Sequence, residues 1–241
     1  MQRRVSALVL VAALAVAGAG CSDDEKKGGG GDDDATPAEV LEQAQKALDE
    51  TSGVTISLET DAVPSGVTGI KSATGVGAHP AAFEGEFELS VNGLPATAEV
   101  IALEGTTYAK NSLLLPEWTA IDPDTYGAPD PATLMEPGGG FSGLISAITG
   151  VEEGDSVRGG DNNREIFTEY SGTIPATAVE ALIPTAKGDF DAVLTISDEG
   201  ELRRAELTGV FYEEADSLTY TLKLDDYGTK AEITAPTTAA P

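Results

Sequence analysis

The sequence predicts an α+β fold in which one large antiparallel sheet is covered on its apolar face by a few helices. Several segments alternate apolar and polar residues with a period of two, and strong turn signals separate some of them. Three other segments carry helical spacing. Because strands twist, a sheet of this many long strands curls, and a curled sheet under helices can enclose a cavity.

The chain begins with the pattern of an export signal. Arg3 and Arg4 precede an apolar run that reaches residue 19, which is shorter than the ~20 residues that span a bilayer. Small residues end the run directly before Cys21, as in a bacterial lipoprotein signal, where the cysteine receives a diacylglycerol. Since Cys21 is the only cysteine, it has no partner for an internal disulfide and is better explained as an attachment point. We therefore expect lipidation at Cys21 and a position on the extracytoplasmic face of the cell membrane, either anchored or partly released.

Composition divides the chain into four parts. Residues 1–20 are the predicted signal peptide, and residues 21–35 form an acidic, glycine-rich tract that cannot bury apolar surface and is predicted to be a disordered tether. Residues 36–235 have the length of one domain with a substantial core. Residues 236–241 are predicted to be a disordered tail.

The first expected element of the domain is a helix. Thr36 is placed as the N-cap, Pro37 as the first helical residue and Glu39 at the capping-box position. An apolar stripe at helical spacing follows, and Gly53 ends the segment.

A group of strands is expected next. Residues 83–91 alternate, so that Phe83 and Phe87 share one face while the intervening glutamates face water. Asn92-Gly93 is a strong signal for a two-residue hairpin loop, and it leads to expected strands at 97–103 and 106–109.

The second half of the domain is expected to contain further helices and strands. Helical spacing is found at 130–136, continuing to Ile148, and at 176–183, where Pro184 follows. Alternating patterns predict long meander strands with one apolar side. These strands are expected at 164–173, 190–197, 202–212, 218–224 and 230–234.

Composition excludes several classes of function. The formal charge is -27, from 14 Lys+Arg against 41 Asp+Glu, which argues against nucleic acid because phosphate binding depends on basic residues. One cysteine and one histidine are too few for a structural zinc site, and only His79, which precedes Pro80 in an expected turn, could pair with a nucleophile. The segment 140–143 lacks the last glycine of a nucleophile elbow, and Asp122 with Asp124 begins a calcium loop that later residues do not complete. We therefore expect no enzyme activity, no cofactor and no metal.

Three stretches are similar to the LppX/LprA/LprF/LprG family of actinobacterial, mycobacterial-type lipoproteins. The first runs from His79-Pro-Ala-Ala-Phe-Glu-Gly85 to Gly105-Thr-Thr-Tyr-Ala109. The second contains Trp118, Tyr126, Leu134-Met-Glu-Pro-Gly138 and Gly140 to Ile148. The third contains Gly200-Glu-Leu-Arg-Arg-Ala-Glu-Leu207, Leu222-Lys-Leu-Asp-Asp-Tyr-Gly228 and Ile233-Thr-Ala-Pro236. Their order and spacing hold along nearly the whole domain.

The resemblance implies a half-barrel of antiparallel strands, similar to LolA and LolB, with helices on the concave face enclosing an apolar cavity for acyl chains. It implies envelope lipids or glycolipids as ligands, shuttled across a periplasm-like space, and a membrane lipid exporter as a partner. Apolar faces of the expected elements supply the candidate cavity lining. The candidates are Phe83, Phe87, Leu89, Ile101, Tyr108, Leu134, Phe141, Leu144, Ile145, Ile148, Leu194, Ile196, Tyr220 and Leu222.

Two questions stay open at this level. The same apolar faces also suit a closed core, in which case the chain is a non-catalytic envelope assembly or adhesion lipoprotein. Segments rich in Pro and Gly, residues 109–118 and 128–140, are candidate loops at a cavity mouth, and plain connectors are the competing interpretation.

Overall fold

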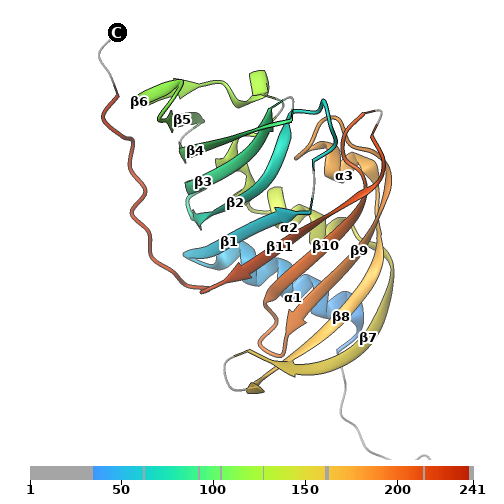
Figure 1. Ribbon diagram of the computed structural model, residues 1–241. Coiled ribbons are helices and arrows are strands. Elements are labelled where there is room, and N and C mark those ends of the chain that lie inside the picture. The colour runs from blue at the N-terminus through green and yellow to red at the C-terminus, as the bar shows by residue number, and fades with distance from the viewer. Residues whose placement is uncertain are drawn as a thin grey trace, which may run out of the picture. The chain divides into compact units, whose positions relative to one another are not determined.

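The computed structural model describes residues 35–238 except 62, 92, 104, 127, 161, 162 and 214. The predicted signal peptide 1–20, the lipidation site Cys21, nearly all of the tether 21–35 and tail residues 239–241 lie outside the described residues. Eleven strands of the described part form a single sheet (Figure 1). Their bounds are β1 (Gly53–Thr60), β2 (Gly69–Ala78), β3 (Ala82–Val91), β4 (Leu94–Leu103), β5 (Thr106–Asn111), β6 (Leu115–Ile121), β7 (Thr149–Gly159), β8 (Glu165–Ile174), β9 (Lys187–Ser197), β10 (Leu202–Val210) and β11 (Leu218–Asp225).

The sheet consists of two meanders that meet at its centre. The strand order is β6-β5-β4-β3-β2-β1-β11-β10-β9-β8-β7, and every neighbouring pair is antiparallel. The sheet is curled and its two edges, β6 and β7, are not paired with each other. This arrangement confirms the predicted fold class of a curled antiparallel sheet with a few helices.

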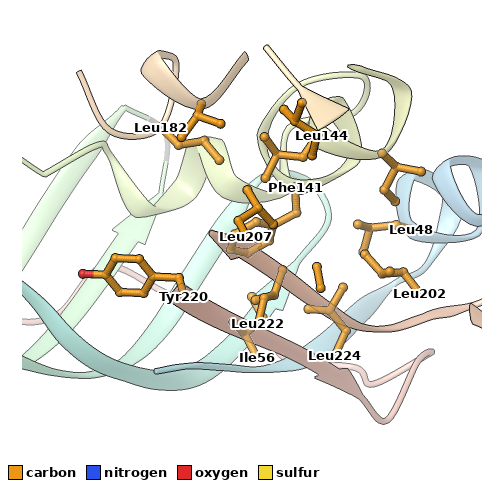
Figure 2. Packing of buried hydrophobic residues seen from close by; sticks show 14 of the residues in the cluster. Leu48, Ile56, Phe141, Leu144, Leu182, Leu202, Leu207, Tyr220, Leu222 and Leu224 are labelled. Carbon is orange, nitrogen blue, oxygen red and sulfur yellow. The ribbon is translucent and has the colours of Figure 1, made fainter. Parts of the chain in front are cut away.

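Helix α1 (Pro37–Glu50) has the predicted N-terminus. The Thr36 hydroxyl accepts a hydrogen bond from the Glu39 amide, and Glu39 Oε2 accepts one from the Thr36 amide at 2.8 Å, which completes a capping box. The buried side of α1 contains Leu41, Ala44 and Leu48. Figure 2 shows Leu48 facing Leu202 of β10, so this helix covers the inner face of the second meander.

The other described helices are short; three of them lie between β6 and β7, and the last lies between β8 and β9. They are the 3-10 helices η1 (Pro123–Tyr126) and η2 (Pro131–Met135) and the α-helices α2 (Gly140–Ala147) and α3 (Ala176–Glu180). Asp130 caps η2 by accepting a hydrogen bond from the Ala132 amide at 3.0 Å. The expected helix at 130–136 is therefore a 3-10 turn, and α2 is a separate helix.

The hairpin between β3 and β4 sets the register of the first meander. Val91 pairs with Leu94 across a two-residue loop, and Gly93 has a φ of 81°, a left-handed value that favours glycine. This is the hairpin that the sequence predicted. The acidic face is also where it was expected, since Glu84 and Glu86 are exposed while Phe83 and Phe87 are buried.

Two edge strands and the C-terminal segment differ from the expectations. Residues 109–118 are a loop only at 112–114, because the rest of the segment is the end of β5 and the start of β6. The expected strand at 230–234 is absent, since the chain leaves the sheet after β11 and the Gly228 amide donates to the Gly53 carbonyl at 3.0 Å. Strand β7 is exposed along almost its whole length, so it lacks the alternation that identifies a half-buried strand.

Candidate functional site

A cavity of about 300 Å³ lies between the inner face of the first meander and the short helices. Its strand residues come mainly from β1 to β6, with a few from β10 and β11. Leu134 of η2, Phe141 and Leu144 of α2, and Val179 of α3 contribute from the helical side. None of the described lining residues carries a charge, although the whole chain has a formal charge of -27.

The cavity exists because the inward side chains of two strands are small. On β4 the inward positions include Ala96, Ala98 and Val100, and on β5 they include Ala109. An alanine contributes only one methyl group to a wall, so the space between these strands and the short helices stays open.

Hydrogen-bonding groups in the wall are mostly occupied by the protein itself. Thr107 Oγ1 donates to Asp130 Oδ1 at 3.1 Å. The Asn111 amide donates to the Thr97 carbonyl, and its oxygen accepts from the amides of two following residues. The polar groups of these side chains are therefore already hydrogen-bonded within the protein, and the cavity presents mainly hydrocarbon to a ligand.

Two tyrosines make the most polar part of the wall. The Tyr220 hydroxyl donates to the Ile70 carbonyl, so the hydrogen bond of 2.6 Å between the two hydroxyl groups is donated by Tyr212. Burial raises the pKa of both tyrosines above the ordinary value. Phe211 packs against Tyr220 with ring centroids 4.8 Å apart and fixes the position of this ring.

Eight of the predicted candidates lie on the cavity wall. They are Phe83, Phe87, Leu89, Leu134, Phe141, Leu144, Tyr220 and Leu222. Figure 2 shows Phe141 and Leu144 from the helical side above Leu222 and Tyr220 of β11. The structure thus brings together side chains that are far apart in the sequence, and contact with a ligand stays a prediction for each of them.

The structure places six other candidates away from the cavity. Ile101 pairs with Glu84 and with Tyr108 on the opposite face of the sheet, because alternate residues of a strand point to opposite sides. Leu194 and Ile196 of β9 lie in the packed core, and so do Ile145 and Ile148.

Several lining residues were not predicted. The alanines of β4 and β5 are among them, as are Ile56, Ile70 and Ala73 from β1 and β2. The register of the β3–β4 hairpin could have identified the β4 residues, because the Asn92-Gly93 loop pairs Phe87 with Ala98.

His79 is half-buried in the turn after β2, and its Nε2 lies 3.2 Å from the Leu48 carbonyl. Among the described residues, no group of three or more potential ligands is arranged to hold a metal ion. Within the same part of the chain, none of the helices has the length and hydropathy needed to cross a membrane.

Known proteins share this fold and sequence pattern. The sequence profile of the LppX_LprAFG lipoprotein family matches residues 36–233. Proteins named "putative phthiocerol dimycocerosate transporter LppX" from Mycobacterium tuberculosis and Mycobacterium bovis are 27% identical to the chain over 212 residues, covering 83% of this chain and 85% of theirs.

Two solved structures have the same fold. The crystal structure of LprF from Mycobacterium bovis matches with a TM-score of 0.64 at 15% identity, covering 83% of this chain and 96% of LprF. The crystal structure of the Mycobacterium tuberculosis lipoprotein LppX matches with a TM-score of 0.58 at 17% identity, covering 82% of this chain and 97% of LppX.

Proposed function

The chain belongs to the LppX_LprAFG lipoprotein family, and from this premise we propose that it is a lipid carrier of the cell envelope. In this proposal Cys21 carries a lipid anchor, the domain lies on the extracytoplasmic side of the cell membrane, and the cavity binds acyl chains of envelope lipids or glycolipids. The carrier moves these lipids across the space outside the membrane and receives or delivers them at a membrane lipid exporter. The name given to the LppX relatives, a transporter of phthiocerol dimycocerosate, supports a lipid ligand.

The observation that carries the proposal is the uncharged wall in a strongly acidic protein. A solvated or charged ligand would leave its polar groups unpaired in this cavity, which costs binding free energy. An acyl chain has no polar groups to leave unpaired, and each CH₂ group that it buries contributes about 0.8 kcal/mol to the free energy of binding. Some ten buried methylenes therefore supply about 8 kcal/mol before the cost of association is subtracted.

The size of the cavity limits what it holds without rearrangement. A volume of about 300 Å³ is at the lower end of small-molecule pockets. We therefore propose that a lipid with several acyl chains enters only when the short helices move away from the sheet. The proposal includes no chemical step, because the site binds by burial alone.

Lipid recovery with the purified chain tests the proposal. The full chain, extracted together with its membrane fraction, is expected to carry lipid that native mass spectrometry detects. Replacing Leu89, which lines the cavity, in the variant Leu89→Trp is expected to reduce the bound lipid at least about fivefold, because the indole occupies the space of the ligand.

A matched control is available on the same strand. Glu86 is exposed on the opposite face of β3, so Glu86→Trp should leave the bound lipid unchanged. Absence of lipid from the unaltered chain, or equal loss in both variants, contradicts the carrier proposal and favours the closed-core assembly or adhesion module.

A further inference from the structure

Most of the large hydrophobic side chains that are exposed in the described part of the chain gather at two hairpin tips. Leu94 is 71% exposed, Leu113 87% and Leu114 82%, and Val91 is 36% exposed. Val91 and Leu94 form the tip between β3 and β4, while Leu113 and Leu114 form the tip between β5 and β6. Because β4 pairs with β5, these two tips are neighbours at one end of the sheet.

The leucines of the second tip are held outward by a defined turn. Asn111 Oδ1 accepts hydrogen bonds from the amides of Leu113 at 2.9 Å and Leu114 at 3.0 Å. The Asn111 amide nitrogen donates to the Thr97 carbonyl of β4, which ties this tip to the strand of the first tip. The exposure of Leu113 and Leu114 is therefore built into the local geometry of both hairpins.

The two tips also lack charge, unlike the turn between β9 and β10. No charged residue occurs from Ser90 to Ala98 or from Asn111 to Pro116. The turn between β9 and β10 contains Asp198, Glu199 and Glu201. An uncharged aliphatic surface of this kind marks an interaction site on a soluble domain.

The tips form the rim of the cavity. Val91 and Leu114 are exposed and also belong to the cavity wall. Behind the second tip, Lys110 Nζ lies 5.7 Å from the ring centroid of Trp118 on β6. Trp118 is three residues from the start of β6, about 10 Å along the strand. Tryptophan and lysine are typical of the interface between hydrocarbon and headgroups.

We propose that the tips of the β3–β4 and β5–β6 hairpins insert into a lipid bilayer and hold the rim of the cavity against it. The aliphatic side chains of the tips gain free energy in hydrocarbon, and the segments 90–98 and 111–116 place no charge there. Interfaces with proteins are instead enriched in aromatic residues and arginine, which the tips do not contain. This inference rests on the proposed function, which supplies the reason for the rim to meet a membrane. Insertion itself can be measured independently of lipid carriage.

The single tryptophan of the chain reports on insertion. The full chain is mixed with phosphatidylcholine vesicles whose acyl chains carry bromine near the carbonyl end, and the fluorescence of Trp118 is recorded. We expect quenching by the brominated lipid, because insertion of the tips brings Trp118 to headgroup depth. The readout reports the position of this hairpin whether or not the N-terminal segment also contacts the vesicle.

Variants separate the tips from the rest of the surface. The double variant Leu94→Ser with Leu113→Ser removes one exposed leucine from each tip, and neither side chain belongs to the cavity wall. It should lower partitioning into the vesicles about tenfold or more for each leucine, since 1.5–3 kcal/mol accompanies full burial of such a side chain and 1.4 kcal/mol is a factor of ten. Val157 of β7 is also exposed, at 53%, and Val157→Ser is the matched control that should be quenched like the unaltered chain.

The outcomes distinguish insertion from lipid carriage. Uptake of a fluorescent fatty acid from micelles is measured on the same samples and should be equal in the tip variant and the unaltered chain. The inference is overturned if protein-free vesicles do not quench the unaltered chain, which is the result expected for a tip that binds a partner protein. It is also overturned if the tip variant is quenched as strongly as the unaltered chain. Quenching without any uptake of fatty acid supports insertion and contradicts the carrier proposal.

Discussion

The two halves of the inner sheet face have the same secondary structure and opposite packing. On β9, in the second meander, the inward positions hold Phe190, Ala192, Leu194 and Ile196, each at most 2% exposed. On β4, in the first meander, the corresponding positions include Ala96 and Ala98 beside the cavity. The same antiparallel pleat thus gives a filled core in one half and an open space in the other.

The helices increase this difference. Helix α1 has 14 residues and covers the inner face of the second meander with a row of buried side chains. The first meander is covered by η2 and α2, which are 5 and 8 residues long. Short helices have few side chains to reach into the sheet, so side-chain size and helix length together decide where the cavity forms.

The largest expected contrast comes from removing one leucine from each half. Leu194→Ala should lower the free energy of unfolding by about 3–4 kcal/mol, because it leaves a void in a filled core. Leu89→Ala should cost about 1 kcal/mol, since Leu89 is half-buried and already borders open space. Urea unfolding of the full chain measures both, and equal losses would contradict the division into a packed and an open half.

This contrast also shows how far the sequence could predict the site. Period-two alternation and the Asn92-Gly93 loop were sufficient for the sheet and for the face that contains Phe83 and Phe87. The same loop fixes the register that places Ile101 opposite Glu84 on the outer face. The outward position of Ile101 could therefore have been predicted from the sequence. The open space beside Ala98 could not be predicted from the sequence, because it depends on how far helices that are distant in sequence extend over β4.

The edge strands could not be predicted from sequence patterns for another reason. An edge strand pairs on one side and can expose both faces, so burial imposes little alternation on it. Strand β7, with Glu152, Glu153 and Asp155, is an example. Charged residues of this kind protect an edge from pairing with other chains, but in a sequence they are also typical of a loop.

A second prediction tests the cover of the open half. Gly140 begins α2 with a φ of 47°, and an added Cβ would overlap the Leu134 carbonyl of η2. Gly140→Ala should therefore lower the free energy of unfolding by about 2–3 kcal/mol, from the left-handed backbone and from the overlap.

The matched control for Gly140 is the glycine of the β3–β4 hairpin. Gly93 also has a left-handed φ, but nothing lies within 4 Å of the position that a Cβ would take. Gly93→Ala should cost only about 1 kcal/mol, which is the backbone contribution alone. If urea unfolding gives the same loss for both variants, the contact between η2 and α2 does not restrain the cover.

The smallest expected effect comes from enlarging one alanine in each half. Ala192 of β9 is 2% exposed and pairs with Leu207 and Gly172, so its surroundings are filled. Ala192→Leu should lower the free energy of unfolding by about 1–2 kcal/mol, because the extra atoms displace packed neighbours.

The same substitution should behave differently in the open half. Ala98 borders the cavity, so Ala98→Leu should change the free energy of unfolding by less than about 0.5 kcal/mol, since the new side chain enters existing space. It should still reduce the uptake of a fluorescent fatty acid, because the leucine occupies part of the cavity. A loss of stability at Ala98 equal to that at Ala192 would mean that the space beside β4 cannot accept additional atoms, and a cavity that cannot accept a leucine side chain cannot accept an acyl chain.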